Sequence, residues 1–254
     1  MECTCTNCKL EGLERVRYFS RQLITADDMT AEQQYFRQKM RRHNRFAHGW
    51  GVVCGSEVKA APDEARPWRV RVCPGYVLAP QGDEIVIGDG VYVDLATGAA
   101  EPEDVCAPWP CPPTGRMPGA EGPRLAYLAI RYAECDARPL RVRGAGCGCD
   151  DTGCEYSRTR DSFELKLLWE IPQSHVKAAA VDAAWAEAVR DPESRRILPT
   201  PPCPECPSEP WVVLARIMLP PQRETALTQG NINYLGRRVL LSTTALQVMM
   251  LNIP

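Results

Sequence analysis

The first strong pattern in the chain has the period of an amphipathic helix. One stripe of mostly apolar side chains recurs at spacings of seven, four, three and four, and it consists of Met29, Phe36, Met40, His43 and Ala47. Thr25 with Asp28, or Thr30 with Gln33, can cap the start of this helix, and Gly49 suits its end. The pattern predicts a helix over residues 26–48. An alanine-rich segment, 174–191, predicts a second helix, and the tail 236–254 predicts a helix or an apolar arm.

Between these helices the period changes to two, which is typical of β-strands. Residues 68–72 alternate apolar and arginine side chains, and residues 75–95 predict three short strands separated by turns. The segments 124–133 and 211–219 are apolar on both faces, as expected of buried strands. In contrast, 162–170 alternates and predicts a half-exposed strand.

These elements predict an α+β fold with a β-rich core, either an antiparallel sheet or sandwich-like. An N-terminal amphipathic helix, a mid-chain helix and long Cys/Pro-rich loops would flank that core. The 23 prolines cluster where neither a regular helix nor a central strand can form. We therefore expect an N-terminal arm and a single α+β domain, divided as follows: arm 1–20, domain 21–254, β-rich core 50–170 and 211–219, and loops 97–123, 143–155 and 192–210.

Charge and hydropathy exclude several classes of protein. Thirty basic and 32 acidic residues give a net charge of −2, so no overall field favours nucleic acid or an anionic membrane. No apolar run approaches the roughly 20 residues that cross a bilayer, and nothing resembles a signal peptide. The basic run within 37–45 lacks interleaved aromatic residues, which favours a solvated or protein-contacting face. We expect a cytoplasmic protein that neither binds nucleic acid nor inserts into a membrane.

Thirteen cysteines are unusual for such a protein, and their close spacing favours metal over disulfides. They predict a structural zinc held by four thiolates from the group Cys147, Cys149, Cys154, Cys203 and Cys206, with Cys3, Cys5 and Cys8 as weaker candidates. Cys203 and Cys206 form a C-x-x-C knuckle that can chelate one ion. Disulfides and unliganded thiols remain the alternatives, and an odd number of cysteines cannot all pair within one chain.

The remaining chemistry-bearing residues give little support for catalysis. The isolated Cys54, Cys73 and Cys135 are interpreted as buried small hydrophobes. His43, on the helix stripe, is interpreted as a packing residue, and His48 follows near the helix end. The sequence contains neither a nucleophile elbow nor a phosphate-binding glycine loop, so no catalytic residue is predicted. The alternative is a zinc- or thiol-dependent enzyme in which His43 or His48 lies beside an open-site, cysteine-bound metal.

Several segments together carry a resemblance to a known family. The segment "RYFSRQLITADDMTAEQQYFRQKMRRHNRFAHGWGVVCGSEV" contains its most specific part, the junction of the helix with "GWGVVCG", and "VRVCPGYVLAPQGDEIVI" follows. The later "CEYSRTRDSFEL" and "CPECPSEPWVVLA" extend it over roughly residues 17–220. Together they resemble structural proteins associated with phage-tail-like contractile injection systems.

The resemblance implies a non-enzymatic structural component at the baseplate or at a fibre or spike attachment. It implies no catalytic residues. Its partners would be other tail and baseplate proteins, together with further copies of this chain in a symmetric particle that can be released from the cell. A cytosolic adaptor or chaperone that leaves the particle after assembly is the remaining alternative.

Overall fold

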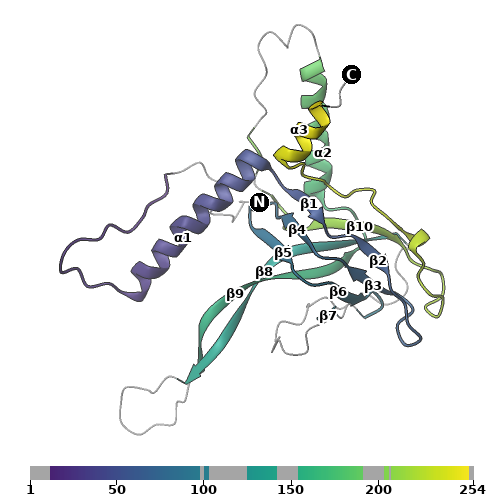
Figure 1. Ribbon diagram of the computed structural model, residues 1–254, viewed down its shortest axis with the longest axis horizontal. Coiled ribbons are helices and arrows are strands. Elements are labelled where there is room, and N and C mark those ends of the chain that lie inside the picture. Colours follow the sequence, from purple (N-terminus) through teal and green to yellow (C-terminus); the bar gives the residue numbers. More distant parts are fainter. Residues whose placement is uncertain are drawn as a thin grey trace.

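The computed structural model describes residues 12–97, 100–102, 125–141, 154–190, 203–205 and 207–251 (Figure 1). The helices are α1 (Ala26–His43), continued by the π-helix η2 (Asn44–His48), then α2 (Gln173–Arg190), the short 3-10 helix η4 (Gln229–Asn231) and α3 (Thr243–Leu251). The strands are β1 (Gly51–Gly55), β2 (Val58–Ala60), β3 (Arg69–Val72), β4 (Gly75–Leu78), β5 (Glu84–Ile87), β6 (Val91–Asp94), β7 (Ala100–Pro102), β8 (Leu125–Arg141), β9 (Cys154–Leu168), β10 (Val212–Met218) and β11 (Ile232–Asn233).

The strands form three antiparallel sheets around one apolar core. Their orders are β1-β4-β5, β2-β3-β6-β7 and β11-β10-β8-β9. All three sheets contribute almost fully buried side chains, among them Val52, Val77, Ile85, Val58, Val70, Val72, Leu128, Ile130, Leu214 and Ile217. Each such side chain contributes about 1.5–3 kcal/mol by leaving water. The predicted α+β fold with a β-rich core is confirmed.

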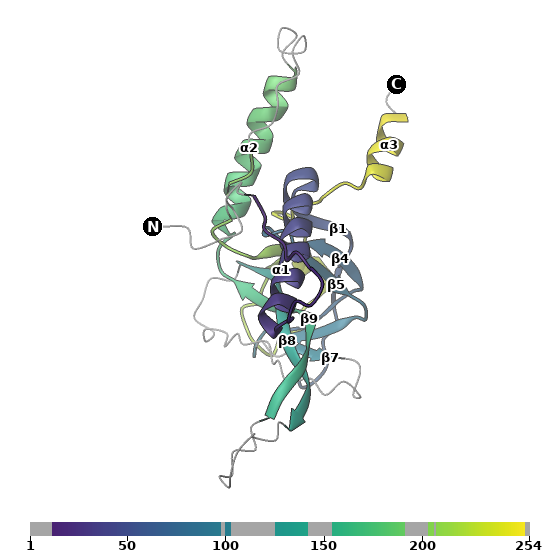
Figure 2. The ribbon, with the colours of Figure 1, turned by 90° about the vertical axis from the view of Figure 1, so that its left-hand side faces the viewer.

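The longest feature is the β8–β9 hairpin, which extends beyond the sheet to which its base belongs. Near its base β8 lies between β10 and β9, with Ile130 opposite both Val212 and Leu165. Pairing with β9 then continues alone to Arg141 opposite Cys154. The outer part of the hairpin therefore projects from the body as a two-stranded ribbon (Figures 1 and 2).

The predicted helices are present with small shifts in their ends. The helix over 26–48 is confirmed as α1 with η2, and α2 begins and ends one residue before the predicted 174–191. Thr25 caps α1: its hydroxyl accepts from the Asp28 amide at 3.2 Å, and the Asp28 carboxylate accepts from the Thr25 amide at 2.9 Å. These hydrogen bonds lower the pKa of Asp28.

The sequence patterns missed several short strands. β2 and β11 have three and two residues, which is too short to show a period of two, and β1 (Gly51–Gly55) does not alternate apolar and polar side chains. β7 lies within the predicted loop 97–123, and β9 begins inside the predicted loop 143–155. In both places strand pairing with a neighbour decides the conformation, which the local composition does not show.

The C-terminal segment returns to the first strand before α3 begins. The Val52 amide donates to the Arg238 carbonyl and the Leu240 amide donates to the Val52 carbonyl, each at 2.9 Å. Gly51 sits so close to this segment that an added Cβ would lie 2.8 Å from the Arg238 carbonyl oxygen. This pairing joins the C-terminal segment to β1 and fixes where α3 leaves the body.

The base of α2 is fixed by a buried histidine. The Nε2 atom of His175 accepts from the Val213 amide at 3.2 Å, and its ring lies edge-on to Trp50 with centroids 4.7 Å apart. Burial lowers the pKa of His175 from 6.5 to about 4, and the nearby charge of Arg238 adds to this effect. Hydrogen bonds with the backbone of Trp211 and Gly236 oppose it only in part.

This histidine should make the protein less stable in mild acid. Between pH 6.5 and about 4 the unfolded chain binds more protons at His175 than the folded chain, so the free energy of unfolding falls as the pH is lowered. The full difference is about 3 kcal/mol. Chemical denaturation at pH 7.5 and 4.5 should show that His175→Gln loses most of this contribution relative to the wild type. Equal pH dependence in both proteins would contradict the assignment.

Candidate assembly surface

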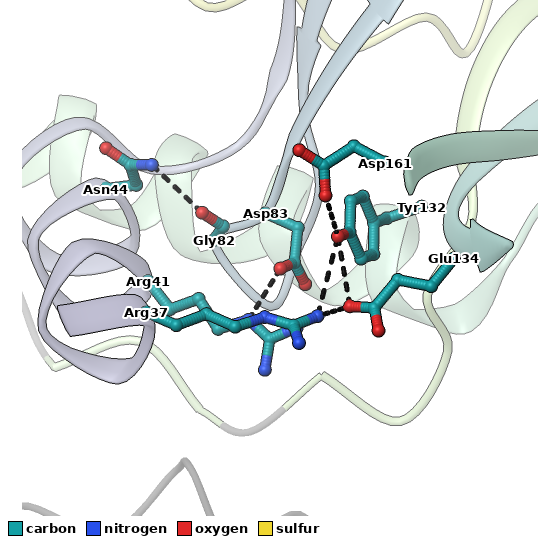
Figure 3. A network of polar contacts seen from close by, with 8 residues as sticks. All are labelled: Arg37, Arg41, Asn44, Gly82, Asp83, Tyr132, Glu134 and Asp161. Atoms are coloured by element: carbon teal, nitrogen blue, oxygen red, sulfur yellow. Dashed lines mark hydrogen bonds and ion pairs between the residues drawn. The ribbon is translucent and has the colours of Figure 1, made fainter. Parts of the chain in front are cut away.

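The helix α1 rests on the body through a close backbone approach at Gly82. This residue has φ of +95°, and a Cβ at its position would lie 2.2 Å from the Arg41 carbonyl oxygen. Only glycine allows the β4–β5 turn to come this close to the helix. The Asn44 side chain then donates to the Gly82 carbonyl at 2.9 Å, and the Arg41 guanidinium binds Asp83 at 2.5 Å (Figure 3).

A second polar contact joins α1 to the β8–β9 hairpin. Arg37 forms an ion pair with Glu134, and its guanidinium lies 5.7 Å from the centre of the Tyr132 ring (Figure 3). The Tyr132 hydroxyl donates to Asp161 at 2.6 Å and lies 3.0 Å from a Glu134 oxygen. Burial and the bond to Asp161 raise the pKa of Tyr132. The helix is thus fixed by charged and hydrogen-bonded groups rather than by apolar packing.

These contacts show which face of α1 meets the body. Arg37, Arg41 and Asn44 face the body, whereas Met29, Phe36 and Met40 are 50%, 58% and 53% exposed. No residue of α1 is buried within the described chain. The basic run within 37–45 predicted a solvated or protein-contacting face, and the structure places Arg37, Arg41 and Asn44 in contact with the body. In the sequence, the turn at Gly82-Asp83 indicated only a change of direction.

The C-terminal helix α3 is apolar and even less covered. Its side chains are uncharged, and Leu246, Val248, Met249 and Leu251 are all exposed. A helix that is apolar around its circumference is ordinarily buried. In Figure 2, α3 stands apart from α2, so the two helices do not cover one another. Among the described residues, no helix has the combination of length and apolar character needed to span a bilayer.

Most of the predicted zinc ligands lie outside the described residues. These are Cys3, Cys5, Cys8, Cys147, Cys149 and Cys206. Cys154 begins β9, and Cys203 is an exposed free thiol. Within the described part of the chain, no three His, Cys, Asp or Glu side chains converge on a possible metal site. The predicted zinc therefore stays a prediction.

The structure does not bring Cys154 and Cys203 together. Cys154 lies opposite Arg141, seven residues beyond Glu134, which is about 24 Å further along the ribbon. Cys203 precedes Pro204, whose carbonyl accepts from Arg45 just beyond α1. Figures 1 and 2 place the hairpin tip and this end of α1 on opposite sides of the body.

The three isolated cysteines differ from one another. Cys135 is buried as predicted, but its sulfur is in a disulfide, so it is not simply a small hydrophobe. Cys73 is a half-buried free thiol, and Cys54 is an exposed one. The prediction that Cys54 is buried is wrong, because it lies where β1 loses regular register with β4, between Val52 and Cys54, and the strand's outer end faces solvent.

The histidine predictions are also corrected. His43 is exposed rather than packed, and its Nε2 atom lies 3.3 Å from the Nε2 atom of His48. Neither histidine belongs to a group of three or more possible metal ligands among the described residues. The histidine that does pack into the body is His175, at the base of α2.

Comparison with known proteins gives a weak structural likeness. No protein-family model matches the chain, and no curated protein matches it. A crystal structure of TssK aligns with 85% of this chain at 11% sequence identity and a TM-score of 0.40. The chain spans 41% of the length of that protein's chain.

The Arg41–Asp83 contact should be worth more than an ordinary surface ion pair. The two side chains are only 17% and 10% exposed, so Asp83→Asn leaves a poorly hydrated guanidinium without its carboxylate. We expect a loss of about 3 kcal/mol in the free energy of unfolding, with faster amide hydrogen exchange in α1. Chemical denaturation and hydrogen-exchange mass spectrometry would measure both effects.

Glu57→Gln is the matched control, because Glu57 pairs with Lys59 on the surface at 3.4 Å with both side chains more than half exposed. It should change the stability by about 0.5 kcal/mol or less. If Asp83→Asn behaves like this control, then polar docking does not hold α1.

Proposed function

We propose that this protein is a non-enzymatic structural component of a contractile injection system or phage-tail-like particle, at the baseplate or at a fibre or spike attachment. The observation that carries the proposal is the division between a closed β core and helices whose apolar faces are uncovered. A free monomer with such helices would lose most of the stability that packing normally gives a helix. A subunit whose neighbours supply the missing contacts would keep that stability.

Three features support self-association as part of this role. The docking of α1 presents its apolar stripe in a fixed direction, and α3 extends a second apolar surface away from the body. In addition, α1 has acidic residues in its first turn and basic residues in its last turn. Two such helices from different copies are therefore complementary in charge when they run antiparallel. Contacts repeated by symmetry fit a particle built from many copies.

The resemblance in sequence specifies which particle is meant. Its most specific segment, residues 17–58, covers the exposed approach to α1, α1 itself, η2 and β1. Its second segment, 70–87, contains the Gly82-Asp83 turn that receives α1. The first segment of the resemblance thus includes the docked helix and the second includes its receiving turn, and these parts set the direction of the apolar stripe.

Substitutions in α3 test the assembly role directly. Leu246→Ser with Met249→Ser removes two exposed apolar side chains, so the body should fold normally while self-association weakens. Analytical ultracentrifugation should show the wild type as an oligomer and the variant shifted to monomer, by at least ten-fold in the dissociation constant. Val86→Ser is the control, since Val86 is an equally exposed apolar residue of strand β5.

A monomeric wild type that never co-purifies with sheath or tube proteins would overturn the proposal. Mass spectrometry of isolated particles separates the structural role from that of an assembly adaptor. The structural role requires the protein to be present at a fixed copy number. An adaptor would be found with assembly intermediates and be missing from finished particles.

We further propose that structural zinc stabilises the cysteine-rich loops. Because Cys154 and Cys203 are far apart, these two would not share one ion, and the remaining candidate ligands are Cys147, Cys149, Cys206, Cys3, Cys5 and Cys8. Metal analysis of the purified protein should find bound zinc, and Cys203→Ser with Cys206→Ser should lower the amount per chain. Protein without zinc, in which every thiol outside a disulfide is alkylated in the native state, would contradict this proposal.

A further inference from the structure

We propose that His43 and His48 form a binding site for a divalent transition metal of the zinc class at the junction of α1 and η2. The inference is independent of the assembly role and of the cysteine zinc. It rests on the geometry of the two imidazole rings and on the rare backbone turn that brings them together. No reaction is assigned to the site.

The backbone at this junction has an unusual conformation. The Gly49 amide donates to the Asn44 carbonyl at 2.9 Å, five residues back, so the chain here is a π-helix. In an α-helix, residues five apart point about 140° away from each other. The wider π-turn brings His43 and His48 onto the same side. Single π-turns are rare, and they occur frequently at functional sites.

Contacts with the body account for the position of the π-turn, but they do not account for the presence of the two histidines. Asn44 and Arg45, inside the turn, are buried and reach the Gly82 and Pro204 carbonyls respectively. Both histidines are exposed, and neither takes part in these two hydrogen bonds. Packing therefore requires neither imidazole, and both ring nitrogens remain open to an ion from solvent.

The ring geometry matches a shared metal. The Nε2 atoms are 3.3 Å apart, and a tetrahedral ion at about 2.0–2.1 Å from each nitrogen would separate them by about 3.3 Å. The ring centroids are 5.0 Å apart, close to the roughly 5.2 Å that the same arrangement requires. A hydrogen bond directed along the line of the two nitrogens would push the centroids to about 5.6 Å, and 3.3 Å is long for one.

The donor set defines the class of ion. Two neutral imidazoles suit Zn²⁺, Cu²⁺ and Ni²⁺, whereas Mg²⁺ and Ca²⁺ prefer oxygen ligands. With two protein ligands, the remaining coordination positions go to water or to a ligand from another molecule. The site should therefore bind zinc more weakly than a four-thiolate site, and exchange it faster.

The chain has only three histidines, which makes a direct test possible. Protein labelled with ¹⁵N at histidine is titrated with Zn²⁺ and followed by long-range ¹H–¹⁵N NMR. The Nε2 resonances of His43 and His48 should shift together, with both rings fixed as Nδ1–H tautomers. The resonances of His175, which is buried, should not change. An imidazole–imidazole hydrogen bond would instead give one Nε2–H and one Nδ1–H ring.

Variants supply the second measurement. His43→Gln and His48→Gln should each weaken Zn²⁺ binding at this site about ten-fold or more in calorimetric titrations. Both variants keep all thirteen cysteines, so zinc bound by thiolates is unaffected. Lys39→Gln, an exposed change on the same helix, is the control and should bind as the wild type does.

Three outcomes would overturn the inference. The first is that neither histidine resonance shifts at millimolar Zn²⁺. The second is that only one of them shifts. The third is that both shift but His48→Gln leaves the response of His43 unchanged, which would mean that each binds an ion alone.

Discussion

The concentration of hydrophobic burial in the strands is the constraint on which the rest of this structure depends. The strictly buried apolar residues of the described chain lie in strands or in the loops beside them, and none lies in α1, α2 or α3. The three sheets close their core without help from the helices. Each helix is then free to present its apolar residues outward, which is unfavourable for a monomer and useful for a subunit.

Polar docking complements this arrangement, because it holds α1 in a fixed direction without burying the apolar side chains of the helix. Arg37 and Arg41 hold α1 by its charged side, and Gly82 lets the β4–β5 turn approach the helix backbone. An apolar interface between α1 and the body would have buried Phe36 and Met40. The same docking pulls Asn44 and Arg45 inward and widens the helix into a π-turn, so the conformation that orients α1 also juxtaposes His43 and His48.

The hairpin and the cysteines show which structural features follow from the local sequence and which depend on residues far apart in the chain. Continuous apolar character identified β8 near its base, and the period of two identified β9 there. Neither pattern extends along the outer ribbon, where pairing between the two strands maintains the conformation. Cysteine spacing likewise identified candidate ligands but not their distances, so Cys154 and Cys203 looked like partners although the ribbon length keeps them apart.

The sequence by itself determined the elements with a clear local pattern: α1 with η2 from its helical period, α2 from its alanine content, the core strands from their apolar or alternating residues, and with them the α+β class. Such patterns follow from which side chains must leave water, and each is readable within a short segment. Only the tertiary structure decided which face of α1 meets the body. A helix with an apolar stripe and a charged side can dock through either, and Asp83, Gly82 and Glu134, remote in the sequence, make the charged side the better fit.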